Sequence, residues 1–141
     1  MNIYKTFLAA IATALLIIPL AAAQSAGGNG QGGRRYNPAT EITVTGTVAE
    51  VQQYTRGGGW GGTHLTLKTD HATLDVHLGP TRFLAEEKFS FAKGDQLEVT
   101  GSKIPYGGGE ALVARLVKKG DKTLTLRDAA GIPLWSRGGR P

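Results

Sequence analysis

Most of this chain alternates between apolar and polar side chains with a period of two. The pattern is cleanest in Thr63–Thr69 (THLTLKT) and Ala72–Leu78 (ATLDVHL), which are joined by the polar dipeptide Asp70-His71. In a β-strand successive side chains point to opposite faces, so each segment would have one apolar face. Two alternating runs with a short polar connection are typical of a β-hairpin. We therefore expect a β-protein in which these two segments are adjacent antiparallel strands.

Further segments with the same period extend this pattern, and one short helix interrupts it. The other predicted strands are Glu41–Tyr54, Gln96–Gly101, Ala111–Lys118 and Thr123–Arg127. Gly46 lies inside the first of them, and we expect a sharp bend there. Gly79-Pro80 predicts the start of a helix over Thr81–Lys88, because proline has no amide hydrogen to lose in a first turn.

The order of these elements predicts a fold class. Three strands, a short helix and two strands, with one strand appended, match an all-β, five-stranded, OB-like Greek-key barrel. We place it at residues 41–128. The alternative is a small β-sandwich, which would explain the alternation but not the helix between strands three and four.

The first 23 residues predict a secretory signal peptide. Lys5 provides a basic start, Phe7–Leu20 is almost entirely apolar, and Ala21–Ala23 offers the small residues that signal peptidase needs, with cleavage before Gln24. An uncleaved anchor is the alternative, but the apolar run is shorter than the roughly 20 residues of a spanning helix. After cleavage no segment is long and apolar enough to span a bilayer. We expect a periplasmic or secreted protein.

Two glycine-rich segments flank the predicted barrel. Residues 24–40 contain few apolar side chains and are expected to form a flexible leader, and residues 129–141 a C-terminal extension and tail. The chain has no cysteine, which excludes disulfides, thiolate metal sites and haem attached through C-x-x-C-H.

Several short motifs resemble those of a known family. They are Val76–Pro80 (VHLGP), Phe91–Asp95 (FAKGD), Val99–Ser102 (VTGS) and Leu126–Asp128 (LRD) with Gly131, Pro133 and Trp135. Together they are similar to the MamS/MamX domain family, small exported domains first named from magnetosome proteins. The resemblance implies a redox or metal-handling partner, since family members occur beside c-type cytochrome segments, and it brings no catalytic residues. The chain departs from the family in having no haem-binding cysteine, and in having Arg82-Phe83 where an aromatic pair would follow Gly-Pro.

An OB-fold binds ligands across strands two and three, between the loop after strand one and the loop between strands four and five. Here these loops are predicted as Thr55–Gly62 (TRGGGWGG) and Lys103–Gly109 (KIPYGGG). Each combines glycine with one aromatic and one cationic residue, and these four form the candidate binding site: Arg56, Trp60, Lys103 and Tyr106. The alternative is that the aromatic residues fold back onto the ends of the barrel.

The central hairpin provides a second candidate site. With the turn at Thr69–Ala72, His64 lies opposite His77 on the outer face, and Asp75 lies diagonal to His64. Side chains directly opposed across strands start about 5 Å apart, close enough to share a divalent metal ion. The alternative is a polar outer face without a ligand, and a register slip of one residue would separate the pair.

Enzyme signatures are missing from the sequence, which has no G-x-S-x-G, P-loop or H-E-x-x-H motif. We therefore expect a non-enzymatic binding module that recognises an envelope protein. Metal binding is one alternative. Single-stranded nucleic acid is another, favoured by the net charge of +5 but disfavoured by export.

Overall fold

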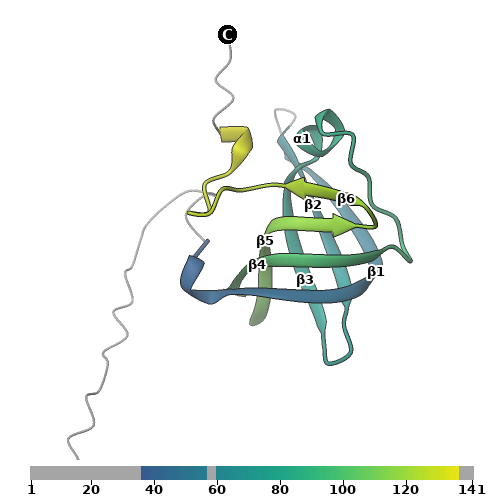
Figure 1. Cartoon of the computed structure of the whole chain (residues 1–141), viewed down its shortest axis with the longest axis vertical. Coiled ribbons are helices and arrows are strands. Elements are labelled where there is room, and N and C mark those ends of the chain that lie inside the picture. Colours follow the sequence, from purple (N-terminus) through teal and green to yellow (C-terminus); the bar gives the residue numbers. More distant parts are fainter. Residues whose placement is uncertain (1–35, 57–59, 137–141) are drawn as a thin grey trace, which may run out of the picture.

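The computed structural model of the chain describes residues 36–56 and 60–136, without the side chains of Arg56 and Trp60. The described residues form a small, mostly β structure (Figure 1). Its elements are η1 (Pro38–Thr40), β1 (Glu41–Arg56), β2 (Trp60–Lys68), β3 (Thr73–Pro80), α1 (Thr81–Glu86), β4 (Gln96–Tyr106), β5 (Gly109–Lys119), β6 (Lys122–Thr125) and η2 (Leu134–Ser136). None of the helices among these residues has the length and apolar character needed to cross a membrane. The predicted signal peptide, residues 1–23, lies outside the described residues.

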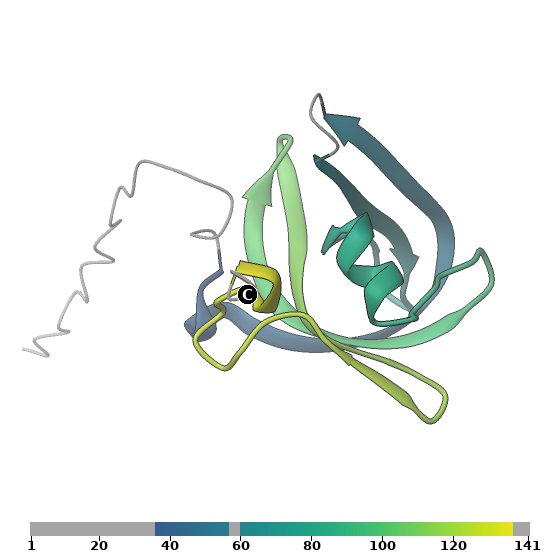
Figure 2. The same cartoon turned by 90° about the horizontal axis from the view of Figure 1, so that it is seen from above.

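Five strands close into a barrel, which confirms the predicted fold class. The sheet order is β3-β2-β1-β4-β5-β6, and these neighbours are antiparallel. A short parallel ladder between β3 and β5 closes the barrel, and β6 is appended beside β5. Seen from above, α1 lies between the β1–β2 hairpin and the β4–β5 hairpin (Figure 2). The short helix between strands three and four is therefore present as expected.

The long first strand bends where glycine was predicted to permit it. β1 pairs with β4 from Glu41 to Thr47 and with β2 from Thr47 onward, so it changes partner one residue after Gly46. A Cβ at Gly46 would lie 2.6 Å from the carbonyl oxygen of Lys68, which no side chain could tolerate. The absence of a side chain lets the two strands approach at this corner.

The core is formed by the inward-facing residues of the alternating strands. Leu65 and Val76, on β2 and β3, have no exposed surface. From α1, Leu84 adds a buried side chain. The buried cluster consists of Val48, Leu65, Leu67, Val76, Leu78, Leu84, Phe89, Leu97, Val99, Leu112, Ala114, Val117, Leu124 and Leu126. The alternation in the sequence thus corresponds to one buried and one exterior face of the sheet.

The strands extend further than predicted, and the glycine-rich loops are correspondingly shorter. The predicted loop Lys103–Gly109 is wrong: β4 continues to Tyr106, and only Gly107 and Gly108 form the turn. Both have positive φ, 55° and 81°, as in the tight turns that match the twist of a hairpin. In the β1–β2 connection, strand pairing continues to Arg56 and Trp60, so residues 57–59 alone lie between the strands.

The helix is shorter than the predicted Thr81–Lys88 and ends at Glu86. Lys88 has a φ of 54°, a left-handed conformation in which the chain reverses. The amide of Phe89 then donates to the carbonyl of Leu84 at 3.0 Å. This reversal places the Phe89 side chain in the core.

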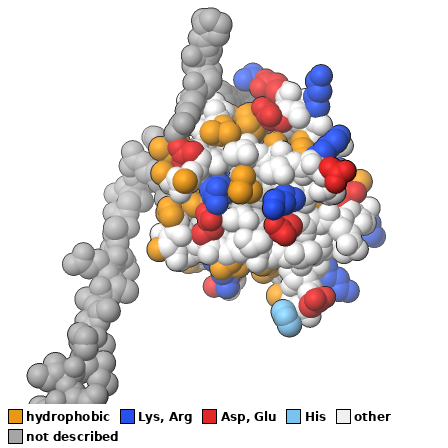
Figure 3. All heavy atoms as spheres, in the orientation of Figure 1, with side chains coloured by type: hydrophobic (Ala, Val, Ile, Leu, Met, Phe, Trp, Pro, Cys, Tyr) orange, Lys and Arg blue, Asp and Glu red, His pale blue; other side chains and the backbone are white. Residues whose placement is uncertain are grey.

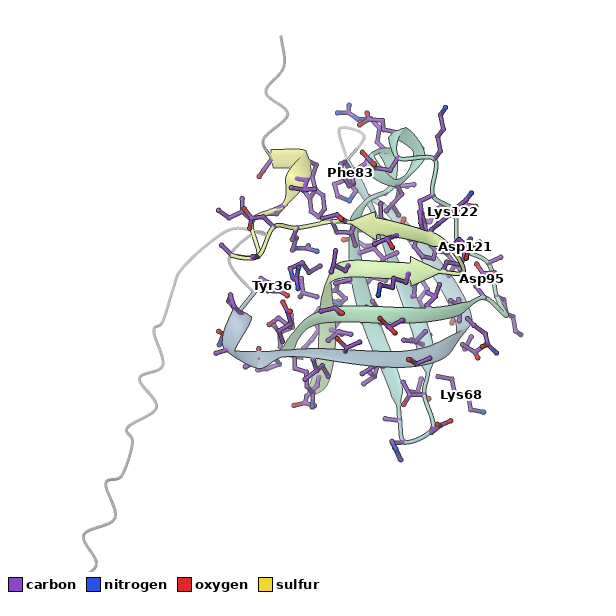
Figure 4. The ribbon with its side chains drawn as sticks, viewed as in Figure 1. Tyr36, Lys68, Phe83, Asp95, Asp121 and Lys122 are labelled. Atoms are coloured by element: carbon purple, nitrogen blue, oxygen red, sulfur yellow. The ribbon has the colours of Figure 1, made fainter. Side chains whose placement is uncertain are left out.

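Residues 36–40, at the end of the predicted leader, are part of the fold. The Tyr36 hydroxyl donates to the carboxylate of Glu41 at the start of β1 (Figure 4). Glu41 also accepts two hydrogen bonds from the Arg115 guanidinium, at 2.8 and 2.7 Å. The Tyr36 ring lies directly over Gly131, where a Cβ would overlap it. These contacts hold the two ends of the domain together.

The C-terminal segment covers the junction between β3 and β5. Arg127 is buried and donates to the carbonyl oxygens of Leu78 and Ala114. Its guanidinium carbon lies 4.9 Å from the centre of the Trp135 ring. Trp135 in turn contacts Phe83 of α1, with ring centroids 5.4 Å apart (Figure 4).

Candidate functional site

The hairpin register predicted from the alternation is confirmed. His64 on β2 is the partner of His77 on β3, and Thr66 is the partner of Asp75. Their sequence neighbours Leu65 and Val76 have no exposed surface and point into the barrel. Because side chains alternate along a strand, the two histidines and Asp75 project from the opposite, outer side of the sheet.

The imidazole rings of His64 and His77 stack on each other. Their centroids are 3.9 Å apart and the ring planes differ by 13°. Asp75 reaches both rings: one carboxylate oxygen lies 3.7 Å from Nδ1 of His64 and the other 3.3 Å from Nε2 of His77. The three residues singled out by the sequence as possible metal ligands therefore form one cluster.

Two tyrosines extend this cluster on either side. Tyr54 of β1 packs edge-on against His64, with centroids 4.9 Å apart, and Tyr106 of β4 packs edge-on against His77 at 4.4 Å. The tyrosines are 46% and 41% exposed. We call the surface formed by Tyr54, His64, Asp75, His77 and Tyr106 the histidine–tyrosine face.

Tyr54 was not expected from the sequence to be a site residue. Its pairing with Gly62 across β1 and β2 indicates its position beside His64. A Cβ at Gly62 would overlap the Tyr54 hydroxyl, so the ring lies flat over the glycine beside His64. An aromatic residue covering a cross-strand glycine is a known stabilising arrangement in sheets. The pattern could have been found once the strands were extended into the glycine-rich segment.

Burial makes His64 less basic than a free histidine. Desolvation is the largest cause of its lowered pKa, followed by repulsion from His77, while Asp75 opposes the shift. The side chains of His64 and His77 are only 16% and 17% exposed. A neutral His64 ring has an unprotonated nitrogen, which can accept a hydrogen bond or coordinate a cation.

The predicted loop site is divided by the structure. Tyr106 joins the histidine–tyrosine face, whereas Lys103 forms an ion pair with Glu110 at 2.7 Å. The side chains of Arg56 and Trp60 lie outside the described residues, so their role stays a prediction. His71, in the turn between β2 and β3, is exposed.

Sequence comparison identifies the family. The profile of the MamS/MamX magnetosome protein family matches residues 40–124, more than half of the chain. The chain belongs to this family. It is also similar to "Magnetosome protein MamS" of Paramagnetospirillum magneticum (strain ATCC 700264 / AMB-1), with 26% identity over 102 residues. The aligned region covers 71% of the chain and 57% of that relative. The chain thus spans little more than half the length of the curated relative it matches.

The region that matches the MamS/MamX family contains the complete histidine–tyrosine face. It runs from the end of η1 into β6 and includes all five residues of the face. The family resemblance inferred from the sequence motifs is therefore confirmed.

Five of the lysine and arginine side chains that the structure describes in this MamS/MamX family member form ion pairs with carboxylates. Basic and acidic side chains are interspersed on the side of the molecule seen in Figure 3. Among the described residues, these pairs of lysine and arginine are Arg82–Glu86, Lys103–Glu110, Arg115–Glu41, Lys118–Glu98 and Lys119–Asp95. A surface for single-stranded nucleic acid combines aromatic platforms with a continuous basic groove. With Asp75 among its rings, the histidine–tyrosine face does not favour a polyanion.

Proposed function

We propose that this MamS/MamX domain is a non-enzymatic binding module that recognises another protein of the cell envelope through the histidine–tyrosine face. The observation that carries the proposal is the pair of tyrosine rings, Tyr54 and Tyr106, each more than two-fifths exposed on the outer side of the barrel. Tyrosine is enriched at protein interfaces because it offers a large rigid contact area with a polar end.

The position of the face supports this proposal. OB-folds bind their ligands across strands two and three, and here His64 and His77 come from β2 and β3 while the tyrosines come from the flanking β1 and β4. His64, His77 and Tyr106 each contact at least two other rings of the face, whereas Tyr54 contacts one. Asp75 also contacts His77. A surface that is already ordered loses little conformational entropy when a partner binds.

The nature of the partner follows from two further expectations. Residues 1–23 predict export, which places the partner in the periplasm or outside the cell. The family resemblance favours a redox or metal-handling protein as the partner. The sequence lacks the common hydrolase and phosphate-binding motifs, and this supports binding rather than catalysis.

Site-specific photocrosslinking in the native envelope tests the proposal. Tyr54 and Tyr106 would each be replaced by p-benzoylphenylalanine, and Thr123, an exposed residue of β6, would be the control position. We expect one adduct of the same mass from both tyrosine positions and none from Thr123. Equal adducts from all three positions, or none from the tyrosines, would contradict recognition through this face.

A further inference from the structure

We infer that His64, His77 and Asp75 form a binding site for one divalent first-row transition-metal ion on the outside of the β2–β3 hairpin. The inference goes beyond the proposed function, because it depends on three side chains of this chain and not on a protein partner. One ligand atom from each of the three residues lies within 4.8 Å of the other two.

The distances are already near those of a coordinated ion. With metal–ligand bonds of about 2.0–2.1 Å, two ligand atoms of a tetrahedral ion lie about 3.3 Å apart. The Asp75 oxygen and Nε2 of His77 are separated by 3.3 Å, and the other Asp75 oxygen and Nδ1 of His64 by 3.7 Å. The carboxylate therefore already lies at nearly the required distance from one nitrogen of each ring, and it is the orientation of the rings that must change.

The backbone beneath the site is firmly positioned. His64 and His77 are cross-strand partners, and Asp75 precedes His77 by two residues on the same face of β3. Directly behind them, Leu65 and Val76 are completely buried in the core. A slip of one residue would expose these core side chains, so the register that brings the ligands together is also the register that the core requires.

Ion binding requires the stacked rings to move. The lone pair of an imidazole nitrogen lies in the plane of its ring, so two stacked rings with centroids 3.9 Å apart and planes differing by only 13° direct their lone pairs side by side and not toward one ion. At least one ring must therefore rotate about its χ2 torsion, which is a broad, low-barrier torsion for histidine. We expect the metal ion to open the stack, and this rearrangement would be visible in the ring signals.

The ligand set indicates the class of ion. Two imidazoles and one carboxylate suit Zn²⁺, Fe²⁺, Ni²⁺ and Cu²⁺, whereas Mg²⁺ and Ca²⁺ prefer oxygen ligands alone. The Asp75 side chain is 38% exposed, so the cluster is open on that side. Water would complete the coordination there, as in other sites with three protein ligands.

Zinc titration of the untagged full chain tests the site. The chain has three histidines and no cysteine, so His71 provides a matched control for the two proposed ligands. By isothermal calorimetry we expect one Zn²⁺ per chain and no binding of Mg²⁺. His64→Gln and His77→Gln should each weaken Zn²⁺ binding about tenfold or more, and His71→Gln less than about twofold.

Histidine NMR gives a second readout that does not depend on the variants. Addition of Zn²⁺ should shift the ring signals of His64 and His77 and leave those of His71 in place. Asp75→Asn, at a partly exposed position, provides a variant that removes a ligand with little effect on the core, and it should also weaken binding. Unmoved His64 and His77 signals, or full Zn²⁺ affinity in the folded Asp75→Asn and His77→Gln proteins, would overturn the inference. Neither result would affect crosslinking through the tyrosines, so the two proposals fail separately.

Discussion

Arg127 donates a hydrogen bond to the carbonyl oxygen of Leu78, one residue beyond the last pair of the parallel ladder that closes the barrel. That last pair is His77 with Val113, and Arg127 also donates to Ala114, the residue after Val113. The guanidinium therefore satisfies backbone acceptors at the point where β3 and β5 separate. The C-terminal segment contributes in this way to the closure of the barrel beside His77.

Arg127→Met should destabilise the fold by about 1–3 kcal/mol, because it removes two hydrogen bonds from the guanidinium to backbone carbonyl groups in the buried junction. Burial lowers the pKa of Arg127 to about 10, which means that keeping its charge in the buried site has a free-energy cost. Replacing Arg127 by methionine removes this cost, so part of the loss in stability is offset. Urea denaturation followed by circular dichroism measures the change. Lys122→Met, at an exposed position on β6, is the control and should change stability by less than about 0.5 kcal/mol. Equal stabilities of the two variants would contradict the role of Arg127 at the junction.

The hairpin at the centre of the site could be predicted from the sequence because its constraints are local. The alternation of Leu65 and Leu67 with polar neighbours, and the short turn after Thr69, determine which residues face each other. The approach of Asp75 to both histidines follows from the same register. This part of the site required no knowledge of the rest of the barrel.

The contact of Tyr106 with His77 could not be predicted, because it depends on strand pairing across the barrel. Tyr106 reaches His77 only because β5, the hairpin partner of β4, also pairs with β3. The glycines around it suggested a loop, since glycine is depleted in strands. Similarly, the end of α1 at Glu86 was not predicted, because Lys88 occupies the left-handed position after the helix, where glycine is more common.

The interaction of Glu41 with Arg115 should stabilise the fold at neutral pH, and this stabilisation should be lost in acid. Two hydrogen bonds from Arg115, and then one from Tyr36, lower the pKa of Glu41 from 4.5 to about 2. A carboxyl group with a lowered pKa in the folded state contributes stability that is complete above pH 4.5 and is lost as the pH falls through 2. Glu41→Gln should therefore be less stable than the unmodified chain at neutral pH, and the difference should shrink between pH 4.5 and 2.

Urea denaturation at a series of pH values measures this effect. Glu98→Gln is the matched control, because Glu98 pairs with Lys118 on the exposed surface of the barrel, where an ion pair contributes little. A difference between Glu41→Gln and the unmodified chain that stayed constant down to pH 2 would show that the carboxylate is not responsible.

Leu65→Ala should destabilise the fold by about 2–5 kcal/mol, as expected for the removal of a fully buried leucine side chain. Leu65 has no exposed surface and lies on β2 immediately after His64. The free energy of unfolding from urea denaturation tests this, with Thr66→Ala on the outer face of the same strand as the control. Similar losses in both variants would be inconsistent with a barrel interior on the Leu65 side of β2.

Gly62→Ala should displace the Tyr54 ring while leaving the barrel intact. The new methyl group would overlap the Tyr54 hydroxyl, which is the far end of a half-exposed side chain and can move away. Its departure removes the edge contact with His64, at a cost of about 0.5–1.5 kcal/mol. The His64 ring signals should shift in the NMR spectrum because they lose the ring current of Tyr54, whereas those of His71 should not.

In Gly109→Ala the new methyl group meets only an ordinary contact, 3.9 Å from the carbonyl oxygen of Tyr106, so this variant serves as the control. Unchanged His64 ring signals in Gly62→Ala would mean that Tyr54 does not contact His64 in solution. Tyr54 would then not be part of the histidine–tyrosine face.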